Sequence, residues 1–159
     1  MRISILAVGK IKERYLTDGI NEFTKRLTPF CRLEINEIAE EKMPDNPSPA
    51  EKVKTLDREG ERLLKAARSG SYLIVLDVDA KQLASDELSA KFDSLALNGK
   101  SDITFIIGGA FGLSAAVRTA AAERLSFSKL TFTHQMIRLL LVEQIYRAYK
   151  ISRGEPYHW

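Results

Sequence analysis

One stretch of this 159-residue chain restricts its fold more than any other. Residues 103–107 form an apolar run rich in β-branched and aromatic side chains, and three of the five residues at positions 108–112 are glycines. Such a run is typical of a buried strand, and glycines let the backbone turn sharply or approach a ligand closely. Ser114 then suits the N-cap of a helix over residues 115–125. The stretch therefore predicts a strand, a loop and a helix in succession.

The glycine loop, residues 108–112, has two interpretations that the residues leave open. The loop either makes a tight turn from strand to helix or lets the backbone approach a bound ligand. Its spacing, Gly-Gly-Ala-Phe-Gly, is neither the GxGxxG fingerprint of dinucleotide-binding proteins nor the GxxxxGK[ST] pattern of the phosphate-binding P-loop. A dinucleotide-binding enzyme would also need its glycine loop early in the chain, so that class is not supported.

Strands and helices alternate along most of the chain. Apolar patterns predict strands at 2–8 and 31–40 and a short strand within 71–81 that ends at Asp77, and helices at 15–27, 50–70 and 85–97, the last with Ser85 as N-cap. We therefore expect an α/β fold with a parallel sheet covered on both faces. Two predicted strands end at Leu76-Asp77 and at Gly108-Gly109. These two ends indicate one crevice, because ligands of such sheets collect at the carboxyl ends of strands.

Composition and charge narrow the class of protein. With 45% hydrophobic and 28% charged residues, residues 1–159 suit one globular domain. No apolar run approaches the roughly 20 residues of a membrane span, and residues 1–10 are too quickly polar for a signal peptide, so we expect a cytoplasmic protein without a membrane partner. One cysteine and two histidines disfavour a metal site. A net charge of +3 permits a polyanionic partner without demanding one.

The last third of the chain departs from the alternating pattern. Residues 125–132 suit a strand and a loop, and residues 134–149 are apolar almost all round, which predicts a helix buried on several sides. Such a helix needs a second covering surface, and a second copy of the chain in a homodimer is the simplest supplier. The tail, residues 154–159, ends in aromatic and imidazole groups, where a disposable terminus is usually small and polar.

Four motifs in this order resemble a known family: LIVLDVDAK, FIIGGAFGLS, LSFSKLTFTHQMIRLLLVEQIYRAYKI and PYHW. The chain is similar over essentially its whole length to the ribosomal large subunit methyltransferase H family. These small SPOUT-class enzymes use S-adenosylmethionine to methylate N3 of a pseudouridine in 23S rRNA. The resemblance implies a SPOUT-type parallel sheet flanked by helices, a C-terminal trefoil knot and an obligate homodimer.

The resemblance also implies a pocket for S-adenosylmethionine. Its residues come from the end of the third strand, from the glycine loop and from one later segment: Leu76, Gly108, Phe127, Ser128, Lys129, Leu130, Thr131 and Phe132. This pocket agrees with the crevice that the strand ends indicate.

The acceptor site is expected at the tail. The family usually has a basic residue after PYH, whereas this chain has Trp159, so the resemblance implies catalytic roles for His158, Tyr157 and an arginine such as Arg147 or Arg153. The arginine would stabilise the negative charge that develops on the pseudouridine, and His158 would accept the N3 proton. Tyr157 would stack on an unpaired base.

These residues also have a purely structural interpretation. In it, His134 caps its helix or packs at the helix start, Arg138 and Arg147 form ion pairs at a dimer interface, and His158 is an unordered chain end. A non-catalytic module that binds RNA or the ribosome is the alternative function. For either function, the net charge of +3 favours recognition of an assembled ribosome over tight capture of naked 23S rRNA.

Overall fold

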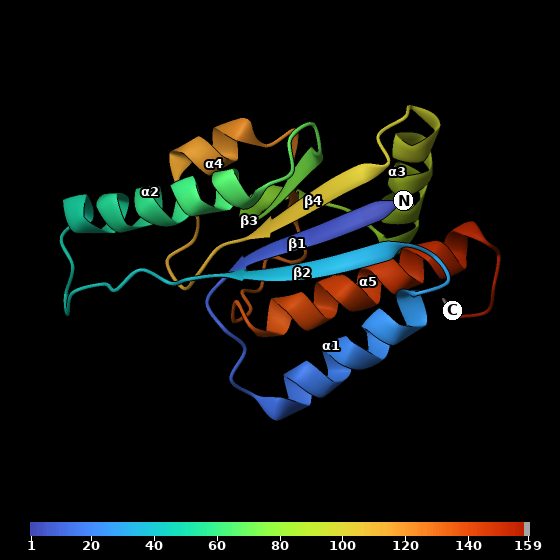
Figure 1. Ribbon diagram of the computed structural model, residues 1–159, viewed down its shortest axis with the longest axis horizontal. Coiled ribbons are helices and arrows are strands. Elements are labelled where there is room, and N and C mark those ends of the chain that lie inside the picture. The colour runs from blue at the N-terminus through green and yellow to red at the C-terminus, as the bar shows by residue number, and fades with distance from the viewer. Residues whose placement is uncertain (158–159) are drawn as a thin grey trace.

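The computed structural model describes residues 1–157, which form a parallel sheet covered by helices on both faces (Figure 1). In chain order the elements are β1 (Arg2–Val8), α1 (Arg14–Leu27), β2 (Arg32–Ile38), α2 (Pro49–Ala66), β3 (Tyr72–Gln82), α3 (Ser85–Leu97), β4 (Asp102–Ile107), α4 (Ala115–Ala120), β5 (Glu123–Ser126) and α5 (Met136–Ser152). The five strands pair in parallel in the order β2-β1-β4-β3-β5. The predicted α/β class is confirmed.

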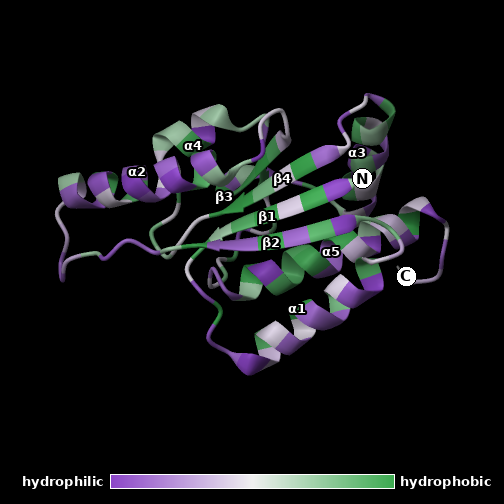
Figure 2. Ribbon diagram, viewed as in Figure 1, coloured by the Kyte–Doolittle hydropathy of each residue, from purple (hydrophilic) through white to green (hydrophobic). Residues whose placement is uncertain are grey.

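Side chains of the central strands alternate between two hydrophobic cores. Ile3, Ile5 and Ala7 of β1 pack with α1, α3 and α5, whereas Leu6 and Val8 pack with α2 and α4. Figure 1 shows α2 and α4 together on one side of the sheet and α1 and α5 on the other. Figure 2 shows hydrophobic residues concentrated in β1, β4 and α5, whereas β2, α1 and α2 carry many hydrophilic ones.

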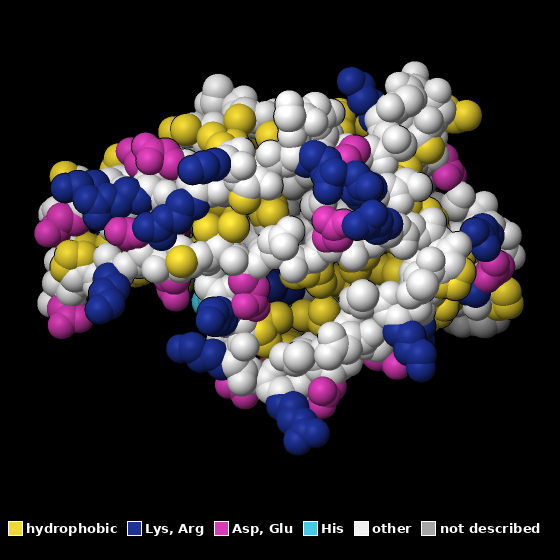
Figure 3. All heavy atoms as spheres, in the orientation of Figure 1, with side chains coloured by type: hydrophobic (Ala, Val, Ile, Leu, Met, Phe, Trp, Pro, Cys, Tyr) yellow, Lys and Arg dark blue, Asp and Glu magenta, His cyan; other side chains and the backbone are white. Residues whose placement is uncertain are grey.

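The outer face of α2 is densely charged, as its sequence predicts. A capping box starts this helix: Ser48 Oγ accepts from the Glu51 N–H at 3.2 Å, and the Glu51 carboxylate accepts from the Ser48 N–H at 2.7 Å. Further along, Arg58 and Arg62 both pair with Glu41, at 3.0 and 2.5 Å. Figure 3 shows basic and acidic side chains interleaved on this side of the molecule, which is typical of a solvated face.

Of two predicted helix caps, one is confirmed and one is wrong. Ser114 caps α4, where its Oγ accepts from the Val117 N–H at 3.3 Å. Ser85 is instead the first residue of α3, and Ala84 holds the N-cap position. The Ser85 hydroxyl donates to Gln144 of α5 at 2.8 Å, so a tertiary contact uses the group that a cap would have needed.

Two further predictions are wrong around β5, for one reason. The helix predicted over residues 115–125 ends with α4, and residues 123–126 form β5 instead. The strand predicted to end at Asp77 continues to Gln82, because Lys81 and Gln82 pair with β5. The pairing of β3 with β5 joins residues far apart in the sequence, and it outweighs the local helix propensity of the alanines before β5.

Helix α5 is covered mainly by its own chain. It begins at Met136, two residues later than predicted, and it lies against the sheet between α1 and α3. These neighbours bury Leu141, Val142 and Ile145 completely. The apolar surface of α5 therefore does not by itself require a second copy of the chain, and the homodimer stays a prediction.

Gly60, in the middle of α2, gives a test of this packing. A Cβ at Gly60 would collide with Ser114 Oγ and lie 3.1 Å from Cγ2 of Val117. Alanine normally stabilises a helix by about 1 kcal/mol relative to glycine, but overpacking costs about 1 to 3 kcal/mol. We therefore expect Gly60→Ala to lower the free energy of unfolding measured with urea. The exposed Glu61→Ala on the same helix is the control, and a more stable Gly60→Ala protein would contradict the packing.

Candidate functional site

A cavity of about 820 Å³ lies at the carboxyl end of β4, beside the point where β3 stops pairing with β4. Leu76 and Asp77 from β3 and Gly108 and Gly109 after β4 all line it, so the two segments that the sequence indicates border one cavity, although β3 continues past Asp77 to Gln82. The start of α1 and the segment between β5 and α5 complete the wall. Its volume falls in the range of small-molecule sites, roughly 300 to 1,000 Å³.

Most of the residues expected to bind the cofactor lie along this cavity. Those that line it are Leu76, Gly108, Phe127, Ser128, Leu130, Thr131 and Phe132. Lys129 is the exception, because its side chain is exposed and does not contribute to the wall. Hydroxyl groups shape the segment, since Ser126 Oγ donates to the Ser128 carbonyl at 3.0 Å and Ser128 Oγ accepts from the Leu130 N–H at 3.0 Å.

The glycine loop is both a tight turn and a wall of the cavity. Gly112 has a φ of +90°, and its N–H donates to the Gly109 carbonyl at 3.1 Å. A Cβ at Gly108 would collide with the Gly112 carbonyl group and lie 2.9 Å from Cγ of Leu113. The turn by itself therefore requires glycine at 108 and 112. The bare backbone that results also borders the cavity, so the two interpretations are compatible.

The sequence did not reveal a charged cluster on the cavity wall. Asp77 has a side chain that is only 3% exposed, and its Oδ2 lies 3.1 Å from Arg118 Nε and 3.3 Å from Arg124 Nη1. Its Oδ1 accepts from the Asp79 N–H at 3.2 Å. Residues 77–80 have no partner on β5, because the pairing with β5 shifts register there. Two guanidinium groups around one carboxylate leave a net positive charge beside the cavity, where Arg118 contributes to the wall.

The start of α5 forms another part of the mouth. His134 and Gln135 line the cavity just before the helix begins. Burial lowers the pKa of the His134 imidazole below its ordinary value, and the nearby Arg138 guanidinium lowers it further. His134 is therefore neutral at pH 7, and it can accept a hydrogen bond or a proton.

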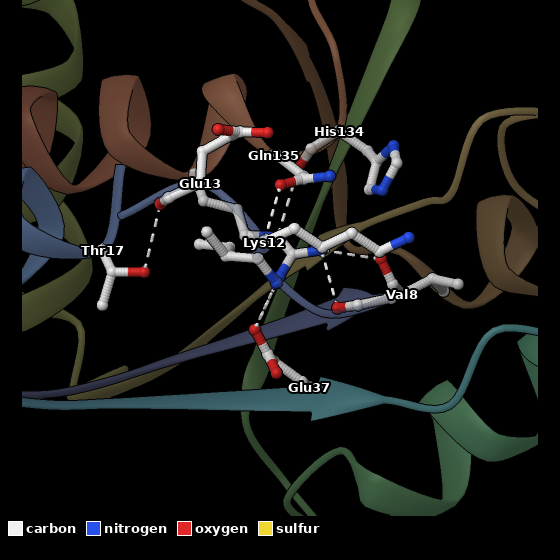
Figure 4. A network of polar contacts seen from close by, with 10 residues as sticks. Val8, Lys12, Glu13, Thr17, Glu37, His134 and Gln135 are labelled. Carbon is white, nitrogen blue, oxygen red and sulfur yellow. Dashed lines mark hydrogen bonds and ion pairs between the residues drawn. The ribbon is translucent and has the colours of Figure 1, made fainter. Parts of the chain in front are cut away.

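Arg138 is the most deeply buried cation near the cavity. Its side chain is 0% exposed, and its Nη2 donates to the Val8 and Gly9 carbonyls at 2.7 and 2.9 Å. Its Nε donates to the His134 carbonyl at 3.1 Å, and its Nη1 pairs with Glu37 at 3.2 Å (Figure 4). The interpretation of Arg138 as an ion pair at a dimer interface is not supported, because the side chain is fully buried within its own chain.

The expected catalytic residues that can be placed lie away from the cavity. Tyr157 folds back onto α5, where its hydroxyl donates to Glu143 at 3.0 Å and its ring lies 4.8 Å from the Arg147 guanidinium. Burial raises the pKa of Tyr157, and the hydrogen bond to Glu143 raises it further. Figure 1 shows this end of α5 opposite the carboxyl ends of the strands. His158 lies outside the described residues.

The distance between the two groups follows from their positions along α5. The cavity borders the first turn of the helix, whereas Arg147 lies 11 residues after Met136, which corresponds to about 16 Å along the axis. Tyr157 folds back onto the same stretch, beside Glu143 and Arg147. Within one chain, the structure therefore does not bring Tyr157 and Arg147 to the residues that line the cavity.

Two further observations concern metals and membranes. Among residues 1–157, no three histidine, cysteine, aspartate or glutamate side chains gather in a way that could hold a metal ion. None of the helices in that part of the chain is both long and apolar enough to cross a bilayer.

The sequence and the fold both have known counterparts. Residues 1–158 match the family described as "Predicted SPOUT methyltransferase". The chain is 54% identical over 158 residues to the ribosomal RNA large subunit methyltransferase H of Halothermothrix orenii and 50% identical over 158 residues to that of Leuconostoc mesenteroides, with 99% of both chains covered in each case. A solved structure titled as that of a probable methylase family protein from Haemophilus influenzae Rd KW20 has a TM-score of 0.53 at 12% identity. It covers 99% of this chain and 70% of its own, and at this identity it supports the fold alone.

The lowered pKa of His134 predicts how stability depends on pH. The unfolded chain binds more protons than the folded chain just below the ordinary imidazole pKa of about 6.5, so stability rises with pH through that window and is lost as pH falls. We expect the NMR titration of His134 to have a midpoint below the ordinary value. His134→Gln assigns the resonance and should remove this part of the pH dependence. A midpoint at or above the ordinary value would contradict the buried environment.

Proposed function

The chain belongs to the SPOUT methyltransferase family, and we propose that it is a methyltransferase of large-subunit ribosomal RNA. The proposed methyl donor is S-adenosylmethionine, and the proposed acceptor is N3 of a pseudouridine in 23S rRNA. One observation carries the proposal: seven of the eight residues expected to bind the cofactor line one cavity at the strand ends. Relatives about 50% identical over their full length are named as methyltransferases of large-subunit rRNA.

The residues of the cavity fit S-adenosylmethionine. Leu76, Phe127 and Leu130 offer apolar surface for adenine, and the backbone of residues 127–132 offers hydrogen-bonding groups. The buried Asp77 carboxylate suits the ribose hydroxyls or the ammonium group, and the Arg118 guanidinium suits the carboxylate of the methionine part. The described residues thus offer partners for each chemical part of the cofactor.

Methyl transfer leaves the protein mainly with positioning and proton transfer. When bound, S-adenosylmethionine supplies an electrophilic methyl group, so the chain must place the acceptor nitrogen in line and help it lose a proton. In our proposal Arg147 stabilises the developing negative charge and His158 accepts the proton. Tyr157 stacks on a base.

A homodimer would bring these two groups together. Because Arg147 and Tyr157 lie well beyond the first turn of α5, an antiparallel arrangement of two α5 helices would place these residues of one chain at the cavity of the other. A strip of half-buried residues along α5, including Met136, Leu140 and Glu143, suits such a contact. The trefoil knot implied by the resemblance stays a prediction.

The substrate is proposed to be the assembled ribosome, in the cytoplasm. Basic residues on α2 are largely interleaved with acidic ones, and the net charge is only +3, so the chain has little surface for tight capture of naked RNA. The alternative, a non-catalytic module that binds RNA or the ribosome, needs no cavity for a small molecule. The cavity therefore favours the enzyme.

Methyl transfer to ribosomes tests the proposed function. The purified protein should transfer a labelled methyl group from S-adenosylmethionine to assembled ribosomes, and mass mapping should place it on N3 of one pseudouridine in 23S rRNA. Naked 23S rRNA should be a poorer substrate. Absence of transfer together with tight ribosome binding would favour the non-catalytic module.

The Gly108→Ala variant tests whether S-adenosylmethionine binds in the cavity. Because the added Cβ collides with the Gly112 carbonyl, the loop must shift, and we expect the affinity for S-adenosylmethionine to fall by about tenfold or more. Gly99→Ala is the matched control, since Gly99 has a φ of +72° and no atom near its Cβ position, and it lies at the other end of the sheet. A folded Gly108→Ala protein with unchanged affinity in calorimetry would show that the cofactor binds elsewhere.

Mixed dimers test whether the tail acts across subunits. A variant lacking residues 157–159 should bind S-adenosylmethionine but lose activity, and Gly108→Ala should lose activity for lack of cofactor. Random mixing makes about half of the dimers heterodimers, each with one complete site, so activity should return to about a quarter of the wild-type value. No recovery in dimers proven to exchange, or a monomer in sedimentation, would refute the shared site.

A further inference from the structure

A hydrophobic side chain at the position of Arg138 could be buried at a smaller cost in folding free energy. The arginine is fully buried in a helix that is otherwise mainly apolar, and a buried cation is destabilising unless its bonds are satisfied. Its partners are the His134 carbonyl, which belongs to a residue of the cavity wall, and the Val8 and Gly9 carbonyls and the Glu37 carboxylate, which lie at the carboxyl ends of β1 and β2 (Figure 4). The hydrogen bonds of Arg138 therefore fix the position of the backbone at Val8, Gly9 and His134.

Two more side chains fix the same loop, residues 9–13, between β1 and α1. Glu37 Oε1, which pairs with Arg138, also accepts from the Ile11 N–H at 3.0 Å. Gln135 Oε1 accepts from the Lys12 N–H at 3.0 Å, and Figure 4 shows Gln135 and Glu37 on either side of the Lys12 backbone. Surface loops are usually mobile, but this one is held from β2 and from the start of α5.

The fixed loop presents exposed cations beside the cavity. Lys10 and Lys12 are both exposed, and in the described part of the chain neither ammonium group has a carboxylate within ion-pair distance. The loop continues into Glu13 and Tyr15, which line the cavity, and Lys12 is bonded through its backbone to Gln135, which lines it too. Residues 9–14 carry three cations and one carboxylate, so their charge suits a polyanion.

We propose that Lys10 and Lys12 bind backbone phosphates of the rRNA next to the target nucleotide, and that Arg138 is the positioning residue that holds their loop. The inference rests on the proposed function. Phosphate contacts set the register of a nucleic acid without reading its sequence, and a loop that is already ordered loses less entropy on binding. The two lysines thereby align the target base with the cavity, and they take no part in the chemical step.

Steady-state methyl transfer to ribosomes tests the two lysines. Lys10→Ala and Lys12→Ala should each raise KM for ribosomes, on the order of threefold to tenfold, while kcat and the affinity for S-adenosylmethionine stay unchanged. Each should also reduce the slope of log(kcat/KM) against log salt by about 0.7 to 0.9. Lys100→Ala, an exposed lysine at the other end of the sheet, is the matched control. An unchanged KM in the double lysine variant, or an equal effect of Lys100→Ala, would overturn the inference.

Arg138→Met tests the positioning role, because methionine fills the space but donates no hydrogen bond. A folded Arg138→Met protein should show the same rise in KM with kcat kept, faster hydrogen exchange at the Ile11 and Lys12 amides, and no further effect in the double lysine variant. Should Arg138→Met fail to fold, Gln135→Ala releases the Lys12 amide alone and should raise KM less. A fall in kcat at unchanged KM would refute the positioning role.

Methyl transfer by the wild-type protein distinguishes failure of this inference from failure of the proposed function. If the wild-type protein transfers methyl groups to ribosomes but the lysine variants behave as it does, the inference fails and the proposed function stands. If it transfers none, the proposed function fails, and cosedimentation with ribosomes still measures whether Lys10 and Lys12 bind RNA.

Discussion

The position of β4 between β1 and β3 in a parallel sheet is the constraint on which the rest of the structure depends. Parallel pairing brings the carboxyl ends of β1 and β4 and residues 76–78 of β3 to one edge, so the loops after β1 and β4 meet this part of β3 there. Helices bury both faces of these strands, which leaves that edge as the open end of a rigid layer. The places of the cavity, the glycine loop and the loop of residues 9–13 all follow from this arrangement.

Buried charges hold that edge in shape. Asp77 binds two arginines from α4 and β5, and Arg138 binds backbone and a carboxylate from β1 and β2. Each charge would be destabilising alone, so its partners and the loops that carry them are tied to one geometry. At the other end of the sheet the ion pairs are partly exposed, as between Arg2 and Asp102, and such pairs contribute little. The buried charges of Asp77 and Arg138 therefore lie at the end of the sheet where the cavity opens.

Helix α5 links the two parts of the proposed site and also separates them. Its first turn borders the cavity, and its middle carries Arg147 and contacts Tyr157. Because an α-helix is a stiff rod, the two parts cannot approach each other within one chain. A two-fold homodimer would bring the two parts together from different chains without any change in the fold, and catalysis would then depend on dimerisation.

Local sequence determined the parts of this protein that depend on neighbouring residues. Apolar periodicity and glycines predicted the order of the elements, the α/β class and the end of β4 at the glycine loop, because each of these signals lies within one short segment. Tertiary structure alone decided the rest. The pairing of residues 123–126 with β3 replaced the end of a predicted helix, and the arginines around Asp77 and the partners of Arg138 come from distant positions. A sequence pattern records which residues are apolar or charged, but the fold decides which of them meet, because contacts between distant segments depend on the packing of the whole chain.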